Sequence, residues 1–283
     1  MSPMCAAEDG QAGLPVDVDG HGVRGMPGMR RPSRAQVVAA LPHWLVEKVP
    51  RDHREPDAAF ARRRRVVGGV TLVGAGLLGA SLTTRPGSWH FYAATAGVAA
   101  TWIAGGFASG PLHLGWMQAR DETLRRPVLT PVVTGITAFA GFYGCALVAR
   151  RIPVLNTAIA SVLDYADQGN DSLVLLTTLA NGAAEEVFFR GALYAAIGEQ
   201  HPVQLSTAAY ALATVPTRNP ALVLAASVMG ALFGAQRRAS GGVQAPVLTH
   251  LTWSVLMLRY LPPLFRDQAV AAHGLRQGSG TAG

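Results

Sequence analysis

Long apolar runs separated by short polar stretches dominate the chain. A helix needs about 20 mostly apolar residues to cross the hydrocarbon core of a bilayer. The runs cover residues 66–83, 89–110, 127–149, 171–197, 204–216, 221–236 and 243–262. The fifth run is short for a complete span, and a weaker segment at 152–165 is a candidate surface or re-entrant helix. The pattern predicts an all-α, polytopic transmembrane bundle of about seven or eight spans.

The two ends of the chain lack this pattern. Residues 1–60 are polar and rich in Gly and Pro, which predicts a disordered, basic cytoplasmic tail. A short amphipathic piece around 41–49 lies either on the membrane surface or in a linker helix. The transmembrane domain is expected over 61–265, and a disordered C-terminal tail over 266–283. No signal-peptide pattern precedes the first run, so this run is expected to act as its own insertion signal.

Charge is scarce and positive. Charged residues make up 14% of the chain and the formal net charge is +7, whereas soluble domains have about 25% charged residues. The arginines stand in short blocks beside apolar runs, not in a basic stripe with interleaved aromatics, so nucleic-acid binding is not expected. The block at 62–65 predicts a cytoplasmic N-terminus in a bacterial plasma membrane, with lipids as partners. The loop with Arg120, Arg125 and Arg126 is then cytoplasmic too.

One apolar run contains charges that are costly in a membrane. Glu185, Glu186 and Arg190 lie within the run at 171–197, and ionisable groups inside a bilayer indicate a functional site by default. Glu186 and Arg190 are at i and i+4, which predicts an ion pair on one helix face. Glu185 is rotated about 100° from Glu186, so it is left free for general-base chemistry. A buried ion-pair network that only fixes helix register is the structural alternative.

Two further polar pairs occur in later runs. His250 and Ser254 share a helix face at i and i+4, near the cytoplasmic end of the last run. Glu185 lies in the cytoplasmic half of an oppositely directed span, so His250 and Glu185 are predicted to meet at similar depth. Tyr210 and Thr214 share a face in the fifth run, and alone they indicate no function. Two cysteines without a CxxC pattern do not suggest a disulfide framework or a cysteine metal site.

These residues give the chain a resemblance to the CPBP family, membrane proteins that include type II CAAX prenyl proteases and bacteriocin-processing or self-immunity relatives. The family pattern is EExxxR in one span, FxxxH in the next and HxxxN or a variant in the last. The segment from Glu185 to Arg190 fits the first motif, with the following glycine. The segment from His250 to Ser254 fits the third, with Ser in place of Asn. The resembling core covers residues 171–262.

The middle motif departs from the family pattern. Tyr210 replaces the Phe and Thr214 replaces the His. The resemblance implies that the first Glu and the two His act on the hydrolytic water, directly or through a metal. Zinc held by Glu185 and His250 is the metal that this reading suggests, but catalytic zinc takes three protein ligands and threonine is a poor one.

The leading hypothesis is therefore an intramembrane metalloprotease, a CAAX-type endopeptidase that cleaves a peptide or protein substrate from the cytoplasmic side. Glu185 would activate water, Glu186 and Arg190 would position it, and His250 would serve as a ligand or oxyanion stabiliser with Ser254 in support. The alternative is a catalytically impaired pseudoenzyme that acts as a membrane scaffold or immunity-type binding protein. A transporter or channel is a third hypothesis, and the absence of an internal repeat weakens it.

Overall fold

The computed structural model describes residues 55–119 and 121–278, and side chains up to residue 265. The predicted amphipathic piece at 41–49 and Arg120 lie outside these residues, as does most of the predicted N-terminal tail. Helical backbone begins at Asp57, inside the range assigned to that tail. It continues to Gly278, inside the range assigned to the C-terminal tail.

The described residues are almost entirely helical. The helices are α3 (Asp57–Ser81), α4 (Trp89–Ser109), α5 (Leu129–Ala149), α6 (Pro153–Asp167), α7 (Asp171–Glu185), the π-helix η1 (Glu186–Leu193), α8 (Tyr194–Ile197), α9 (Pro202–Thr214), the 3₁₀ turn η2 (Val215–Thr217), α10 (Pro220–Ser240) and α11 (Gln244–Gly278). One antiparallel hairpin pairs β1 (Met117–Gln118) with β2 (Leu124–Arg125). The predicted all-α class is confirmed, and the hairpin is a small local addition to it.

Side-chain caps and prolines set where several helices begin. The Ser88 hydroxyl accepts from the Phe91 backbone N–H at 3.2 Å, the Asn170 side chain caps α7, and Asn219 caps α10. These side chains satisfy backbone donors that have no partner within the helix. Pro occupies the first turn of α6, α9 and α10, where its missing N–H is not needed. The breaks between apolar runs are therefore encoded locally.

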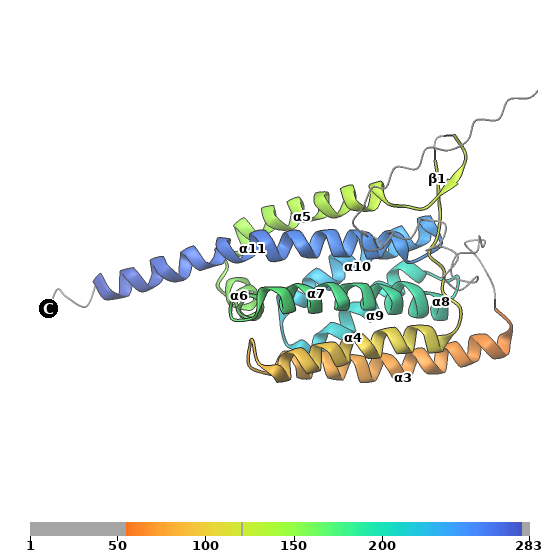
Figure 1. Ribbon diagram of the computed structural model, residues 1–283, viewed down its shortest axis with the longest axis horizontal. Coiled ribbons are helices and arrows are strands. Elements are labelled where there is room, and N and C mark those ends of the chain that lie inside the picture. Colours follow the sequence, from red (N-terminus) through yellow and green to blue (C-terminus); the bar gives the residue numbers. More distant parts are fainter. Residues whose placement is uncertain (1–54, 120, 279–283) are drawn as a thin grey trace, which may run out of the picture.

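The long helices lie side by side along the long axis of the molecule, and α6 is seen nearly end-on at one end (Figure 1). Packing pairs α3 with α4, α5 with α11, and α9 with α10, while α7 contacts both α4 and α11. The α7–η1–α8 segment contacts α3, α4, α9, α10 and α11 in turn. The run with the anomalous charges is thus at the centre of the bundle, which keeps those charges away from lipid.

Three of the described helices, α4, α5 and α10, are long and apolar enough to cross a bilayer. The most hydrophobic stretch of α5 is only 11% buried. Its exposed side chains include Leu129, Val133 and Ile136, which suits a surface that faces lipid. These helices and their exposed apolar side chains indicate an integral membrane protein.

An aromatic core lies behind the charged segment. Trp102 of α4 packs against Phe188 and Phe189 of η1, with ring centroids 4.7 Å and 5.0 Å apart. All three side chains are almost completely buried. Gly74 of α3 leaves room for the Trp102 ring, because any side chain there would overlap it. Gly74 therefore serves packing inside one molecule, and the aromatic core holds η1 against α4.

Candidate functional site

The backbone changes type at the charged cluster. α7 ends at Glu185, and the segment Glu186–Leu193 is a π-helix, where the sequence predicted a continuous α-helix. π-helical turns are rare in proteins, and those that occur often lie at functional sites. The wider turn begins between the two glutamates, so each of them belongs to a different helical geometry.

Glu186 is at the centre of a buried polar cluster. Its Oε1 accepts from Arg190 Nη1 at 3.2 Å and lies 2.9 Å from His250 Nδ1. Glu186 and Arg190 have no exposed surface, and His250 is nearly buried. The predicted ion pair is confirmed. His250, however, contacts Glu186 and not Glu185, which differs from the predicted meeting of His250 with Glu185.

Glu185 has a different partner. Its carboxylate, which is half-buried, accepts a hydrogen bond from Tyr210 Oη to Oε2 at 2.5 Å. The ring of Tyr210 lies 4.7 Å from the ring of Phe189, between centroids. The Arg190 guanidinium carbon is 4.5 Å from the centroid of the same Tyr210 ring. Glu185 and the Glu186 cluster therefore meet through Tyr210 and Arg190.

Aromatic rings and one glycine fix the position of His250. Phe233 of α10 stacks on the imidazole, with centroids 4.8 Å apart and planes inclined by 22°. On another side, a Cβ built at Gly182 would lie 3.3 Å from His250 Cδ2 and 3.4 Å from Nε2. The bare backbone of Gly182 thus leaves room for the ring. Nδ1 is directed at Glu186, and Nε2 lies on the side of Gly182.

Two buried atoms of the cluster have no hydrogen-bond partner among the described residues. They are Glu186 Oε2 and Arg190 Nε. Arg190 otherwise donates to Glu186 and, through Nη2, to the Gly230 carbonyl at 3.3 Å. Buried polar atoms are normally hydrogen-bonded, so an unsatisfied pair in one cluster calls for an explanation. A water or a ligand group at this position would supply it.

Thr214 and Ser254, the other two motif positions, are buried but do not join these contacts. The Thr214 hydroxyl donates to the Tyr210 carbonyl at 2.9 Å, within its own helix. Within the described part of the chain, no hydrogen bond links Ser254 to His250. Sequence reasoning singled out Glu185, Glu186, Arg190 and His250, which lie together in the structure. It gave no role to Tyr210, whose replacement of a family Phe was the one available signal.

Supporting residues from α10 and α11 were also missed. Arg237 Nε donates to the Arg190 carbonyl at 2.8 Å, and its guanidinium lies over Tyr194. Gln236 Nε2 donates to Thr249 at 2.7 Å, and the Thr249 hydroxyl donates to the Pro131 carbonyl at 2.9 Å. These bonds fasten α10 and α11 beside the cluster. The bonded residues are not neighbours in the sequence, so no local sequence pattern predicts these bonds.

The donors present do not fit a typical catalytic zinc. Among the side chains that the structure describes, residues 55–119 and 121–265, no group of three His, Cys, Asp or Glu is placed to hold a metal ion. Glu186 and His250 bind each other, and Thr214 is engaged with the backbone. The predicted pair of Glu185 and His250 alone falls short of the three protein ligands that such a site uses.

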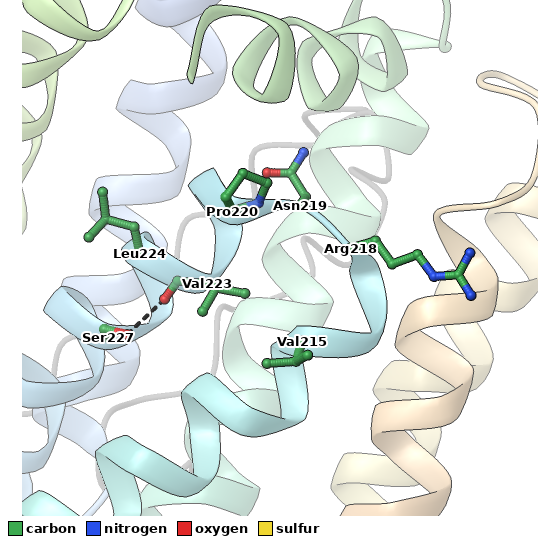
Figure 2. Close-up of a pocket in the computed structure, with 7 residues that line it drawn as sticks. All are labelled: Val215, Arg218, Asn219, Pro220, Val223, Leu224 and Ser227. Atoms are coloured by element: carbon green, nitrogen blue, oxygen red, sulfur yellow. Dashed lines mark hydrogen bonds between the residues drawn. The ribbon is translucent and has the colours of Figure 1, made fainter. Parts of the chain in front are cut away.

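An open pocket lies elsewhere, where η2 joins α10. It is lined by Val215, Arg218, Asn219, Pro220, Val223, Leu224 and Ser227 (Figure 2). Its polar side chains are mostly engaged locally: Ser227 Oγ donates to the Val223 carbonyl at 2.8 Å, and Asn219 caps the helix. Arg218 points away from Leu224 and Ser227 in this view. The pocket contains none of the residues of the charged cluster.

Comparison with known proteins matches the part of the chain that holds this cluster. Residues 170–256 fit the family model described as type II CAAX prenyl endopeptidase Rce1-like. These residues form an Rce1-like domain. The match confirms the resemblance inferred from the motifs, and it contains both glutamates, Tyr210, Thr214, His250 and Ser254. Searches of curated proteins and of solved structures found no match to the chain.

The Rce1-like domain coincides with α7 to the first part of α11. Of the helices before it, α4 supplies Trp102 to the aromatic core that supports η1. The family model that residues 170–256 match describes a prenyl endopeptidase of the CAAX type.

Proposed function

We propose that this protein is an intramembrane endopeptidase in which Glu185 activates the hydrolytic water. The observation that carries the proposal is the division of labour between the two glutamates. Glu186 is fully buried and bound to Arg190 and His250, whereas Glu185 is half-buried and bound only through Oε2 among the described residues. Glu185 Oε1 is therefore available to a water molecule that enters beside it.

The reaction requires no group beyond these side chains and water. The Glu185 carboxylate takes a proton from the water as the water oxygen bonds to the carbonyl carbon of the scissile peptide. The carbonyl π electrons move onto its oxygen and form an oxyanion. Glu185 then returns the proton to the amide nitrogen as the C–N bond breaks. The oxyanion re-forms a carbonyl, and the products are a carboxylic acid and an amine.

His250 would stabilise the oxyanion. Its Nδ1 lies 2.9 Å from Glu186 Oε1, and in the doubly protonated form of the ring Nε2 also carries a proton. The Nε2–H would then donate to the oxyanion. Arg190 balances the charge of Glu186 and fixes its orientation. Ser254 would support the same region as a second hydroxyl donor.

The substrate in this proposal is a peptide or protein segment that enters from the cytoplasmic side, with the surrounding lipids as the other partners. Arginines near one end of the bundle support this side, because Arg62, Arg64 and Arg65 at the start of α3 are exposed. The proposed topology has a cytoplasmic N-terminus in a bacterial plasma membrane and about seven or eight spans. Reporter fusions placed in successive loops would test it.

Peptide cleavage is the direct test of the function. The purified protein in lipid bilayers would be incubated with a peptide library, and products identified by mass spectrometry. Glu185→Gln should lower kcat by roughly 10²- to 10⁴-fold, the range for a general base. Glu122→Gln, which changes an exposed carboxyl outside the site, is the matched control and should cleave like the wild type. Equal rates for Glu185→Gln and wild type would remove Glu185 from the reaction.

One observation favours a second candidate, a catalytically impaired membrane scaffold or immunity-type binding protein. Thr214, at the position of the family histidine, has its hydroxyl bound to its own helix. This candidate predicts no cleavage of any library peptide, together with specific binding of a protein partner that survives Glu185→Gln. Cleavage that depends on Glu185 would exclude it.

A further inference from the structure

The hydrogen bond between Tyr210 and Glu185 is an unusual feature of this domain, because the family pattern has Phe at position 210. Tyr210 is 8% exposed, and its hydroxyl reaches Glu185 Oε2 from a neighbouring helix. A buried tyrosine hydroxyl normally has a partner, so burial alone could account for the bond. The choice of partner is what matters: it is the carboxylate left free for chemistry.

The ring of Tyr210 has little freedom to move. Phe189 packs against it at 4.7 Å, and the Arg190 guanidinium lies over it at 4.5 Å. Gly230 of α10 also borders the ring, since a Cβ there would lie 3.4 Å from Tyr210 Cδ1. A side chain with only two rotatable bonds, confined on several sides, holds its hydroxyl at a fixed point. A fixed donor in turn fixes the carboxylate that accepts from it.

Position 214 contributes no such donor. It lies one turn after Tyr210 on α9, and its hydroxyl bonds to the Tyr210 carbonyl. On this face of α9, the polar group that contacts Glu185 comes from position 210, while the hydroxyl at position 214 bonds only to the backbone of its own helix. Relative to the family pattern, position 210 has gained a polar side chain and position 214 has lost its histidine.

We propose that Tyr210 is a positioning residue that orients the Glu185 carboxylate through Oε2, and that it substitutes for the histidine absent from position 214. The inference rests on the proposed endopeptidase function. In it, Tyr210 keeps its proton throughout the reaction. Its O–H binds Oε2, which directs Oε1 toward the water and stabilises the anionic form of Glu185. A charge-assisted hydrogen bond of this kind is stronger than one between neutral groups.

Tyr210→Phe removes only the hydroxyl and is the central variant. We expect kcat to fall by roughly 10- to 100-fold with KM unchanged, since the lost bond is to a charged group. The matched control is Tyr165→Phe. The Tyr165 hydroxyl donates to the Leu82 and Thr84 carbonyls at 2.8 Å, so its loss should lower thermal stability but not kcat. Unchanged kcat in Tyr210→Phe would overturn the proposal.

Infrared difference spectroscopy separates positioning from general support of the fold. The carboxyl band of Glu185 is identified as the one lost in Glu185→Gln. It should shift in Tyr210→Phe and stay in place in Tyr165→Phe. A fall in kcat without this shift would mean that Tyr210 acts through packing, against the proposal. The band is measurable even if the wild type cleaves nothing, so loss of the proposed function and loss of the Tyr210–Glu185 bond are distinguishable.

The double variant Tyr210→Phe with Thr214→His tests the substitution of one position for the other. It rebuilds the FxxxH pattern on the same helix face. We expect it to recover part of the kcat lost in Tyr210→Phe. A double variant no faster than Tyr210→Phe would overturn the claim that position 210 substitutes for position 214.

Discussion

Arg63 and Arg190 are both buried arginines paired with a glutamate, yet the structure satisfies them differently. Every side-chain nitrogen of Arg63 donates: Nε and Nη2 to Glu55, Nη1 to Ser109 at 3.0 Å, and Nη2 also to the Pro111 carbonyl at 3.0 Å. Arg190 leaves Nε without a partner among the described residues, and its partner Glu186 leaves Oε2 without one.

A structural ion pair and a functional one differ in how completely their buried polar atoms are hydrogen-bonded. The network of Arg63, in which every side-chain nitrogen has a partner, ties the start of α3 to the end of α4. The cluster of Arg190, Glu186 and His250 leaves Glu186 Oε2 and Arg190 Nε without partners among the described residues, next to the half-buried Glu185. Burial of charge alone therefore does not indicate a site. Incomplete hydrogen bonding of a buried ion pair does indicate a site.

Removing each arginine should give the largest difference between the two ion pairs. Arg63→Met and Arg190→Met each leave a glutamate without its cationic partner, and we expect each to lose about 3–5 kcal/mol of stability. Only Arg190→Met should also lose peptide cleavage, measured per folded molecule. Thermal unfolding and cleavage assays check the two effects, and exposed Arg62→Met is the control. Loss of cleavage in folded Arg63→Met would contradict the distinction.

The glycine beside each cluster gives a test of intermediate size. A Cβ at Gly110, which has a φ of 143°, would lie 2.7 Å from Arg63 Nη2, whereas one at Gly182 would lie 3.3 Å from His250 Cδ2. We expect Gly110→Ala to destabilise the fold without changing kcat. Gly182→Ala should displace His250, cost about 1–3 kcal/mol of stability and lower kcat.

The open helix position Gly97, with nothing within 4 Å of a built Cβ, supplies the control Gly97→Ala. This variant should resemble the wild type in stability and cleavage. If Gly182→Ala keeps full kcat, the position of His250 is not critical and its proposed role at the oxyanion falls.

Hydroxyl removal gives the smallest effects. Ser109→Ala would leave Arg63 Nη1 without an acceptor, at a cost of about 1–3 kcal/mol. Thr214→Val loses a bond within one helix, at a cost of about 1 kcal/mol, with no change in kcat. Urea or thermal unfolding, together with cleavage rates, measures both. A large loss of kcat in Thr214→Val would show that position 214 serves the reaction after all.

Much of the architecture followed from the sequence. Each apolar run became a helix, and the weak segment at 152–165 became α6. The ion pair of Glu186 with Arg190 was also predicted, because residues four apart share a helix face. The arginine block at 62–65 was interpreted only as a cytoplasmic flank of the first run. Arg63 of that block is 1% exposed, since Glu55, Ser109 and Pro111 surround it.

The sequence predicted which residues belong to the candidate site, but not how they contact one another. Charges within an apolar run identified Glu185, Glu186 and Arg190, and helical spacing added His250 and Ser254. The partners were not predictable. His250 meets Glu186 across 64 positions of sequence, and Tyr210 meets Glu185 across 25. The π-helix that begins at Glu186 had no sequence signature.

By itself, the sequence determined the helices and the presence of buried charge, because hydropathy and helical periodicity act between near neighbours in the chain. The tertiary structure decided which charges are fully satisfied and which remain open. That outcome depends on the packing of α7 and η1 against α4, α9, α10 and α11, where donors and acceptors from distant segments compete for the same partners. The residue pattern of one segment does not determine the outcome, because the competing groups belong to other segments.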